Sequence, residues 1–412
     1  MAAPQSLHSS AYLAKLRQRL SAHDRWSKGL SGGTQADLSY HDLSGLPLSG
    51  VTLRNAKMVG AILTDSNFSG SDLRAAVLLM ADMERTNLNN ANLMGADLRG
   101  ACLNNADLSE ANLAGADLRT GTLSAVSTRN TPDDRDPSLA RNTQLVDAKL
   151  NRSILVGSNL ENCDLTGAEL IDADLSGADL SGAILISADL SGATLKNTTL
   201  TGAVLSGATL DDFAARQILT LGIDPQGELR VLGAELFELL DRHRRWLDSG
   251  GQQGKRLELD LCDLGGAPLD ELDLSAVKIQ RCNLAGASFT NTVLTMSDLA
   301  WCNFTDANFT KATLSGCSFR RANLTRAIMK DAVLDAVPLS GDPERPWPVN
   351  LQHAKLIDAD LRIASGSGVL LRDADLTGAR VNMALVRTAD LTGAILPATM
   401  TGGRGAKAPK RP

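Results

Sequence analysis

The sequence predicts an all-β solenoid, a coil of short extended segments built from one small unit. Three observations predict this fold class: apolar residues return at every fifth position over most of the 412 residues, Leu occurs 68 times, and aromatic residues make up only 3% of the chain. Such a bias is typical of one unit repeated many times. A period of five fits neither an α-helix, whose period is 3.6, nor a simple strand, whose period is two.

The five-residue period holds over four runs, without a failure in the first three. Apolar residues fill 18 fifth positions in 38–123, 14 in 145–210 and 17 in 259–339. A fourth run fills ten positions in 351–396, of which only Gly366 is not apolar. Stacking such coils would bury Leu over Leu and pair each backbone with the next coil.

Each pentad predicts two inward positions, the central Leu and the small residue two positions before it, as in Ala91 and Ala96. Asp or Asn often precedes the centre directly, and Gly or Asn often stands two positions after it, which suits tight corners. A buried Leu contributes roughly 1.5–3 kcal/mol, so many modest contributions are expected to replace large aromatic anchors.

Stretches such as Ala-Asn-Leu-Met-Gly-Ala-Asp-Leu-Arg-Gly (91–100) and Ala-Asp-Leu-Ser-Gly-Ala-Asp-Leu-Ser-Gly (173–182) resemble pentapeptide repeat proteins. The resemblance covers about 70% of the chain. It implies a right-handed quadrilateral β-helix with four pentads per coil. The family includes DNA mimics that bind type II topoisomerases, and many members with no known activity, so the fold alone implies little about function.

Helical caps are expected over 12–30 and 228–248, before two tandem halves, because apolar residues, His and Trp recur there at helical spacing. Both segments contain His-x-x-Trp, and each is followed by two Gly that would end the helix, at 32–33 and at 250–251. A short helix over 212–221 would close the first half, and each helix would cover unpaired backbone at a solenoid end. The predicted parts are a helical cap over 1–37, a solenoid over 38–210 with an insertion at 124–144, a helical linker and cap over 211–258, a second solenoid over 259–396 with an insertion at 340–350, and a disordered basic tail over 397–412.

Composition excludes several classes of protein. Lys and Arg total 41 against 47 Asp and Glu, a net charge of −6, which argues against direct nucleic-acid binding. Apolar runs are too short to span a bilayer, and no secretory signal is visible. Six Cys without paired spacing indicate free thiols in a reducing compartment, so we expect a cytoplasmic protein.

The cysteines and histidines predict structure more than chemistry. Cys262, Cys282 and Cys302 lie 20 residues apart at an inward position, so a ladder of core thiols is expected, and parallel side chains disfavour a disulfide. Cys102 falls at an outward position and is predicted to be the most reactive thiol. Two of the five His belong to the caps. No catalytic residue, metal or cofactor is expected.

Arg281, Trp301 and Arg321 lie 20 residues apart at an outward corner, which predicts an Arg–Trp–Arg stack. The stack is either a surface cluster satisfied within itself or a contact for a partner, since exposed Trp and Arg are typical interface anchors. Trp347 stands in the Pro-rich second insertion, where it either packs back on the solenoid or binds a partner.

The run from 145 to 212 is acidic, with ten acids against three bases, a net charge of −7. DNA of the same length, roughly 17 Å, would carry about 10 charges. Mimicry of DNA by this segment is therefore an open alternative to an ordinary solvated face. The acidic residues concerned are Glu161, Asp164, Glu169, Asp174 and Asp179.

Together these patterns predict a non-catalytic protein-interaction scaffold that displays loops and charged faces on a rigid β-solenoid. The expected partner-binding residues are Arg281, Trp301, Arg321 and Trp347. The alternative is a DNA mimic that binds a type II topoisomerase, DNA gyrase, through the acidic second run. The partner is an unknown protein, with no membrane binding expected. The sequence shows no cap after Leu396, which leaves that end open to pairing with a second copy.

Overall fold

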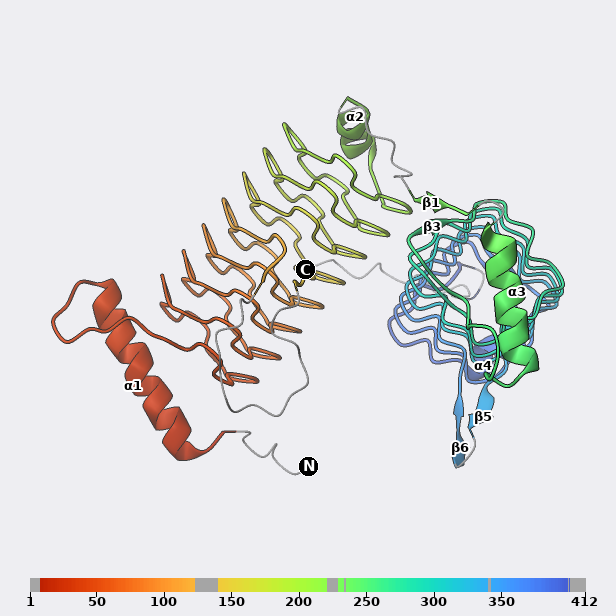
Figure 1. Ribbon diagram of the computed structural model, residues 1–412, viewed down its shortest axis with the longest axis horizontal. Helices are drawn as coiled ribbons and strands as arrows, with labels where there is room; N and C mark the ends of the chain where they lie inside the picture. The colour runs from red at the N-terminus through yellow and green to blue at the C-terminus, as the bar shows by residue number, and fades with distance from the viewer. Residues whose placement is uncertain are drawn as a thin grey trace. The chain divides into compact units, whose positions relative to one another are not determined.

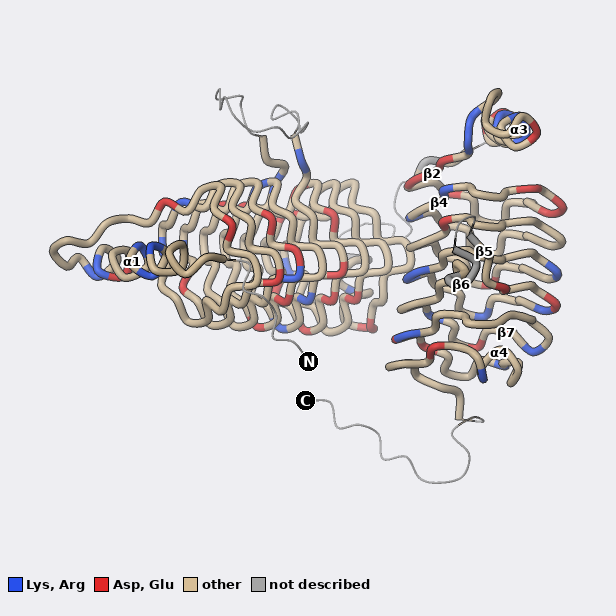
Figure 2. The backbone as a smooth tube through the Cα atoms, turned by 90° about the horizontal axis from the view of Figure 1, so that it is seen from below, with Lys and Arg blue, Asp and Glu red and all other residues tan. Residues whose placement is uncertain are grey.

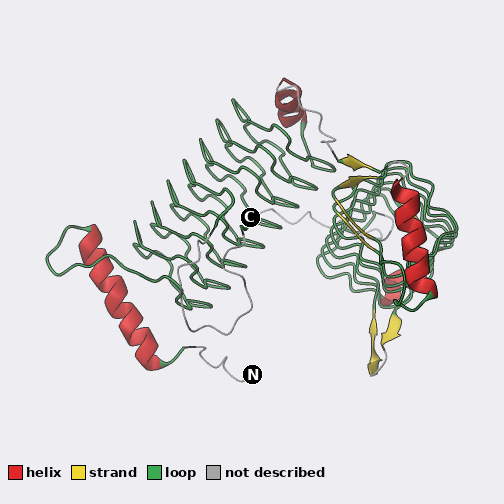
Figure 3. Ribbon diagram, viewed as in Figure 1, coloured by secondary structure: helices red, strands yellow, loops and turns green. Residues whose placement is uncertain are grey.

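The computed structural model describes residues 8–122, 140–220, 229–232, 235–339, 342–398 and 400. The chain divides into two compact units, Met1–Glu228 and Leu229–Pro412. Figure 1 shows that each unit is a stack of similar coils, and Figure 3 shows that most of each stack has no regular helix or strand.

Coils are joined by single parallel bridges between residues 20 apart, as between Asp37 and Lys57 and between Lys57 and Val77. The central residue of each pentad donates its N–H to the coil above: the Leu38 nitrogen lies 2.7 Å from the Lys57 oxygen. Each side of a coil is too short to form a long strand, yet its backbone groups are paired. One coil is therefore four pentads, or 20 residues, where no insertion intervenes.

The core of each unit consists of the predicted inward positions. Leu88 and Ala91 of the first unit are at most 1% exposed. In the second unit, four fully buried Phe gather in one cluster, in which the rings of Phe289 and Phe309 lie parallel with centroids 4.7 Å apart. The units have separate cores, each built from its own coils and helices.

The corners between pentads use the left-handed backbone conformation even where the residue is not Gly, as at Asn55, with φ of 59°. The residue before each pentad centre supports the corner. Oδ1 of Asp174 accepts a hydrogen bond from the Ser176 nitrogen at 3.0 Å, and Oδ1 of Asp179 accepts one from the Ser181 nitrogen at 2.9 Å. Asp and Asn recur there because a short side-chain acceptor reaches the backbone two residues on.

The described residues contain four α-helices. Helix α1 (Ser10–Ser27) packs Leu16 against the first core, and α3 (Glu235–Asp248) packs Leu236 against the second. Helix α2 (Asp212–Thr220) buries Ile218 in the first unit. Helix α4 (Met383–Thr388) lies inside the fourth run.

Helix α4 is a departure from the predicted run of pentads. Asn382 caps it, since Oδ1 of Asn382 accepts a hydrogen bond from the Ala384 nitrogen at 3.0 Å. The helix still buries Leu385 and Val386 in the core of the second unit. Val386 therefore fills the inward position that the five-residue period assigns to it, but from a helix. Beyond α4, Leu391 and Leu396 are only partly buried.

The short strands mark neighbouring coils and one hairpin. Parallel pairs are formed by β1 with β3, β2 with β4 and β7 with β8, and an antiparallel pair by β5 with β6. Their bounds are β1 Arg230–Val231, β2 Glu258–Asp260, β3 Cys262–Asp263, β4 Lys278–Gln280, β5 Val337–Leu339, β6 Asp342–Trp347, β7 Asp360–Leu361 and β8 Arg380–Val381.

The two predicted insertions leave the coils differently. The second is the β5–β6 hairpin, in which Val337 pairs with Trp347. Of the first, residues 123–139 lie outside the described part, and the ends are joined by an antiparallel bridge between Gly121 and Arg141. Residues 401–412 of the predicted tail also lie outside the described part.

One histidine fastens each cap to the coil that follows. His23 and His243 are fully buried, and their Nδ1 atoms accept hydrogen bonds from the backbone nitrogens of Ala36 at 2.9 Å and Leu257 at 3.1 Å. The rings stack on Trp26 and Trp246. Only a neutral imidazole can accept at Nδ1, and burial lowers the pKa of both His.

We expect both caps to be sensitive to acid. The folded His side chains take up protons less readily than those of the unfolded chain, so stability is fully present above the ordinary pKa of about 6.5 and is lost as pH falls below it. Thermal unfolding between pH 7.5 and 5.5 should show a falling melting temperature. The double variant His23→Asn/His243→Asn keeps an acceptor without a titrating ring, so an equal fall in that variant would contradict the assignment.

Candidate protein-interaction surfaces

Trp301 is covered by neighbouring side chains, which differs from its predicted outward exposure. The residue lies at a corner, with φ of 66°, but is only 8% exposed. The guanidinium carbons of Arg321 and Arg320 lie 5.3 and 5.9 Å from the centre of its ring. Arg281 pairs with Asp260, whose Oδ1 lies 2.8 Å from the Arg281 Nε. The side chains of Arg320 and Arg321 thus lie over the Trp301 ring, and this nearly buried ring is a poor anchor for a partner.

Trp347 is both packed and exposed. It ends strand β6 and is 49% exposed. A Cβ added at Gly316 would lie 3.4 Å from the Trp347 Cδ1, 3.0 Å from a Val337 methyl and 2.6 Å from the Met296 sulfur. We call Met296, Gly316, Val337 and Trp347 the hairpin corner. The absence of a side chain at Gly316 lets the hairpin approach the coil, and part of the indole stays open to solvent.

At the base of the first insertion the chain also packs against a Gly and a Met of the coil, but here the side chain of Arg141 takes the place of an aromatic ring. A Cβ at Gly100 would lie 3.0 Å from the Gly121 Cα and would also meet the Met80 sulfur. The Arg141 side chain donates to the Gly100 oxygen at 2.5 Å and to the Met80 oxygen at 3.1 Å. A Met followed 20 residues later by Gly, one coil below an insertion, is the sequence signal that our prediction missed.

The acidic residues of the second run are partly exposed, and several stabilise their own coils. Besides Asp174 and Asp179, Asp164 accepts a hydrogen bond from the Thr166 nitrogen at 3.1 Å. Glu169 accepts one from the Asn151 side chain at 2.8 Å. Figure 2 shows acids and bases interspersed along the first unit. These carboxylates have a local structural role that is independent of any partner.

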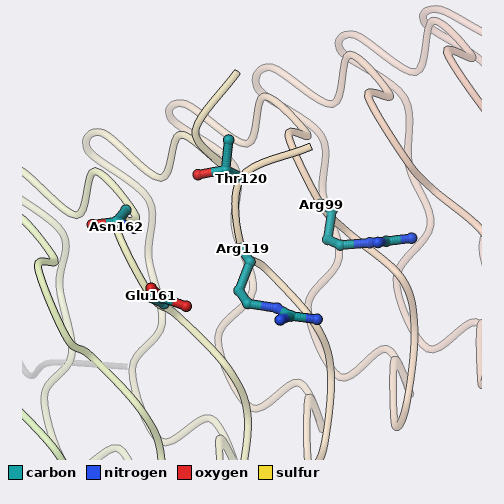
Figure 4. A pocket seen from close by; sticks show the side chains of 5 residues that line it. All are labelled: Arg99, Arg119, Thr120, Glu161 and Asn162. Atoms are coloured by element: carbon teal, nitrogen blue, oxygen red, sulfur yellow. The ribbon is translucent and has the colours of Figure 1, made fainter. Parts of the chain in front are cut away.

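Glu161 lines a pocket of about 260 Å³ together with Arg99, Arg119, Thr120 and Asn162. Figure 4 shows that the three charged side chains, those of Arg99, Arg119 and Glu161, come from successive coils. Arg99 binds Asp97 through two hydrogen bonds of 2.8 Å, and Arg119 binds Asp117 through bonds of 3.0 and 2.9 Å. Both guanidinium groups are largely neutralised by their own coil, so the pocket has no strong charge to select a ligand.

The cysteines lie as expected in part. Cys262, Cys282 and Cys302 are buried, and the Cys282 sulfur accepts a hydrogen bond from the Cys262 nitrogen at 3.4 Å. Cys102 is partly exposed, but burial raises its pKa, which disfavours the reactive thiolate. In the described part of the chain no three His, Cys, Asp or Glu side chains gather to hold a metal ion, and no helix is long and apolar enough to span a bilayer.

The family model for pentapeptide repeats matches residues 34–124, 143–212, 258–341 and 349–382. The chain belongs to the pentapeptide repeat family. Pentapeptide repeat proteins form right-handed quadrilateral β-helices, which agrees with the 20-residue coils described above. No curated protein matches the chain.

The chain matches solved structures of other pentapeptide repeat proteins, but its sequence identity to them is low. HetL, from the cyanobacterium Nostoc and involved in heterocyst differentiation regulation, is 21% identical, with 95% of this chain and 98% of HetL covered and a TM-score of 0.19. QnrB1, a plasmid-mediated fluoroquinolone resistance protein, is 17% identical, with 63% and 91% covered and a TM-score of 0.23. Rfr23 from the cyanobacterium Cyanothece is 18% identical, with 48% and 96% covered and a TM-score of 0.18.

Proposed function

We propose that this pentapeptide repeat protein is a non-catalytic scaffold that binds a protein partner through the hairpin corner. The observation that carries the proposal is Trp347, half exposed at the end of a hairpin whose base rests on Gly316. Large aromatic side chains with part of their surface already packed lose little freedom on binding and are the commonest interface anchors. Met296 and Val337 beside the ring extend the apolar contact.

The hairpin is suited to contact a partner through its side chains and not through pairing of its backbone with an added strand. Pro338, Pro346 and Pro348 lie in or beside β5 and β6 and lack the N–H group that an added strand would need. Fixed backbone angles at these prolines also reduce the conformational entropy lost on binding. The hairpin is therefore suited to present Trp347 in one orientation.

Replacing Trp347 by Ala is expected to weaken partner binding strongly without unfolding the second unit. Loss of a central Trp anchor costs about 2 kcal/mol or more, about a 30-fold loss of affinity. Affinity capture from a native extract, followed by quantitative mass spectrometry, should show a protein held by the unchanged chain and lost by Trp347→Ala. The matched control is Tyr40→Ala, which removes an aromatic side chain that is 64% exposed in the first unit.

Capture of the same proteins at the same level by Trp347→Ala would exclude the hairpin corner. Trp301→Ala does not test partner binding, because the Trp301 ring is buried. We expect this variant to lower the stability of the second unit.

Binding of a type II topoisomerase through the acidic second run has weaker support. Asp164, Asp174 and Asp179 direct a carboxylate oxygen to the backbone of their own corner, which explains their recurrence without a partner. Such Asx interactions are a general property of tight turns. The proposal therefore rests on the hairpin corner and not on the acidic face.

A further inference from the structure

A cluster of basic side chains lies between α3 and the first coil of the second unit. Arg242, Lys255 and Arg256 line a small pocket of about 80 Å³ together with Leu239, Leu257 and Glu258. Figure 2 shows basic residues on α3 and on the chain that leads from it to β2. Three positive charges and one negative charge thus surround one small hollow.

The backbone fixes where these three side chains start. The Lys255 nitrogen donates to the Arg242 oxygen at 3.0 Å. Gly254 lies against the helix, since an added Cβ would be 2.7 Å from the Trp246 nitrogen. The Leu257 nitrogen donates to the buried His243 at 3.1 Å. The segment that carries Lys255 and Arg256 is therefore held on α3 at several points, and the charges are brought together before any ligand arrives.

Arg256 is fixed further along its side chain. Its Nε donates to the backbone oxygen of Ala276 on the following coil, which leaves the two terminal nitrogens of the guanidinium for other acceptors. Arg242 and Lys255 are exposed, and neither side chain forms an ion pair within the described residues. Neighbouring Arg244 and Arg245, in contrast, both pair with Asp241.

The first unit has the same backbone arrangement without the charges. The Thr34 nitrogen donates to the Ala22 oxygen at 3.0 Å, as Lys255 does to Arg242. The Gln35 side chain donates to the Asn55 oxygen at 2.6 Å, as Arg256 does to Ala276. Ala22, Thr34 and Gln35 therefore occupy the places of Arg242, Lys255 and Arg256. A cap folds without the three cations, so the fold does not account for them.

We propose that this pocket binds the phosphate group of a small phosphate monoester. Like charges that are brought together without partners repel one another and attract a multivalent anion. The arginine fork matches two oxygens of a phosphate, and the lysine supplies a point charge. Glu258 reduces the lining charge to +2, and it lies in register with Lys278 on the next strand. The hollow has room for the phosphate group, and the rest of the molecule would extend into solvent.

The test is a binding titration of the full chain with inorganic phosphate and with O-phosphoserine, by calorimetry in a buffer free of other oxyanions. We expect one saturable site per chain. The variant Arg242→Ala/Lys255→Thr/Arg256→Gln copies the first cap into the second and should bind both probes at least tenfold more weakly. Its melting temperature, measured in the absence of phosphate, checks that the cap still folds.

The control variant Lys57→Thr/Lys196→Thr/Lys330→Thr removes the same number of charges from exposed positions elsewhere, and its affinity should stay within twofold of the unchanged chain. Binding of O-phosphoserine and of inorganic phosphate with similar affinity supports recognition of the phosphate group itself. The proposal fails if the unchanged chain shows no saturable binding, if the cap variant binds as tightly as the unchanged chain, or if the control variant loses as much affinity as the cap variant.

Discussion

Replacing Phe304 by Ala should destabilise the second unit by about 3–5 kcal/mol, the usual cost of deleting a buried aromatic ring. Phe304 is fully buried, and its ring centroid lies 5.3 Å from that of Phe309, 5.6 Å from that of Phe319 and 5.9 Å from that of Phe289. The variant leaves a cavity and removes three edge-on ring contacts. A narrow coil with a paired backbone cannot collapse into that space without breaking bridges to its neighbours.

Urea unfolding followed by circular dichroism would measure the loss. The matched control is Phe237→Ala in α3 of the same unit, where the side chain is 71% exposed and the expected loss is well below that of Phe304→Ala. Because the two units have separate cores, the transition that Phe304→Ala shifts should belong to the second unit. A loss as small as that of Phe237→Ala would mean that the aromatic cluster is not a main source of stability.

Gly254→Ala is expected to be the most damaging single methyl addition in the second cap. Gly254 has φ of +75°, which alone costs a non-Gly residue about 1–2 kcal/mol. The new Cβ would also meet the Arg242 carbonyl oxygen and the Trp246 nitrogen, both of them backbone atoms that cannot turn aside. Overpacking of this kind costs about 1–3 kcal/mol more.

Gly266→Ala separates the two contributions, because Gly266 has φ of +66° with nothing within 4 Å of the position of a Cβ. Gly266→Ala should therefore lose only the stability that a positive φ costs a residue other than Gly. Thermal melts of both variants, followed by circular dichroism, would give the difference in melting temperature. Equal losses would show that the helix and the following segment are not in close contact at Gly254.

The coils could be predicted from the sequence because the residues of each pentad determine the local backbone conformation and the inward side chains of that pentad. A Leu at the centre, a small residue before it and a corner residue after it specify one side of a coil, and the comparison with known families confirms the family. Helix α4 was missed for the same reason. Val381, Val386 and Leu391 keep the period of five, so the apolar pattern continues across a segment that forms a helix.

The candidate surfaces were less predictable, because position on a corner does not determine exposure. Spacing placed Trp301 at an outward corner, but its exposure depends on how the side chains of Arg320 and Arg321 turn. Trp347 stands in an insertion outside the period, so the repeat says nothing of its contacts. The basic pocket appears only when the two caps are compared in space, since Arg242 and Lys255 are 13 residues apart along the chain.

The buried histidine at the start of each unit has a consequence for how the chain can change in length. A helix covers the first coil of each stack. A unit added by duplication therefore brings its own capping helix, and its hydrophobic core can stay separate from that of the preceding unit. Coils within a stack contact only their neighbours, and whole units are closed at the helix. The number of coils in a stack and the number of units can therefore vary separately, and one backbone arrangement of the cap carries different side chains, Arg242 in the second unit and Ala22 in the first.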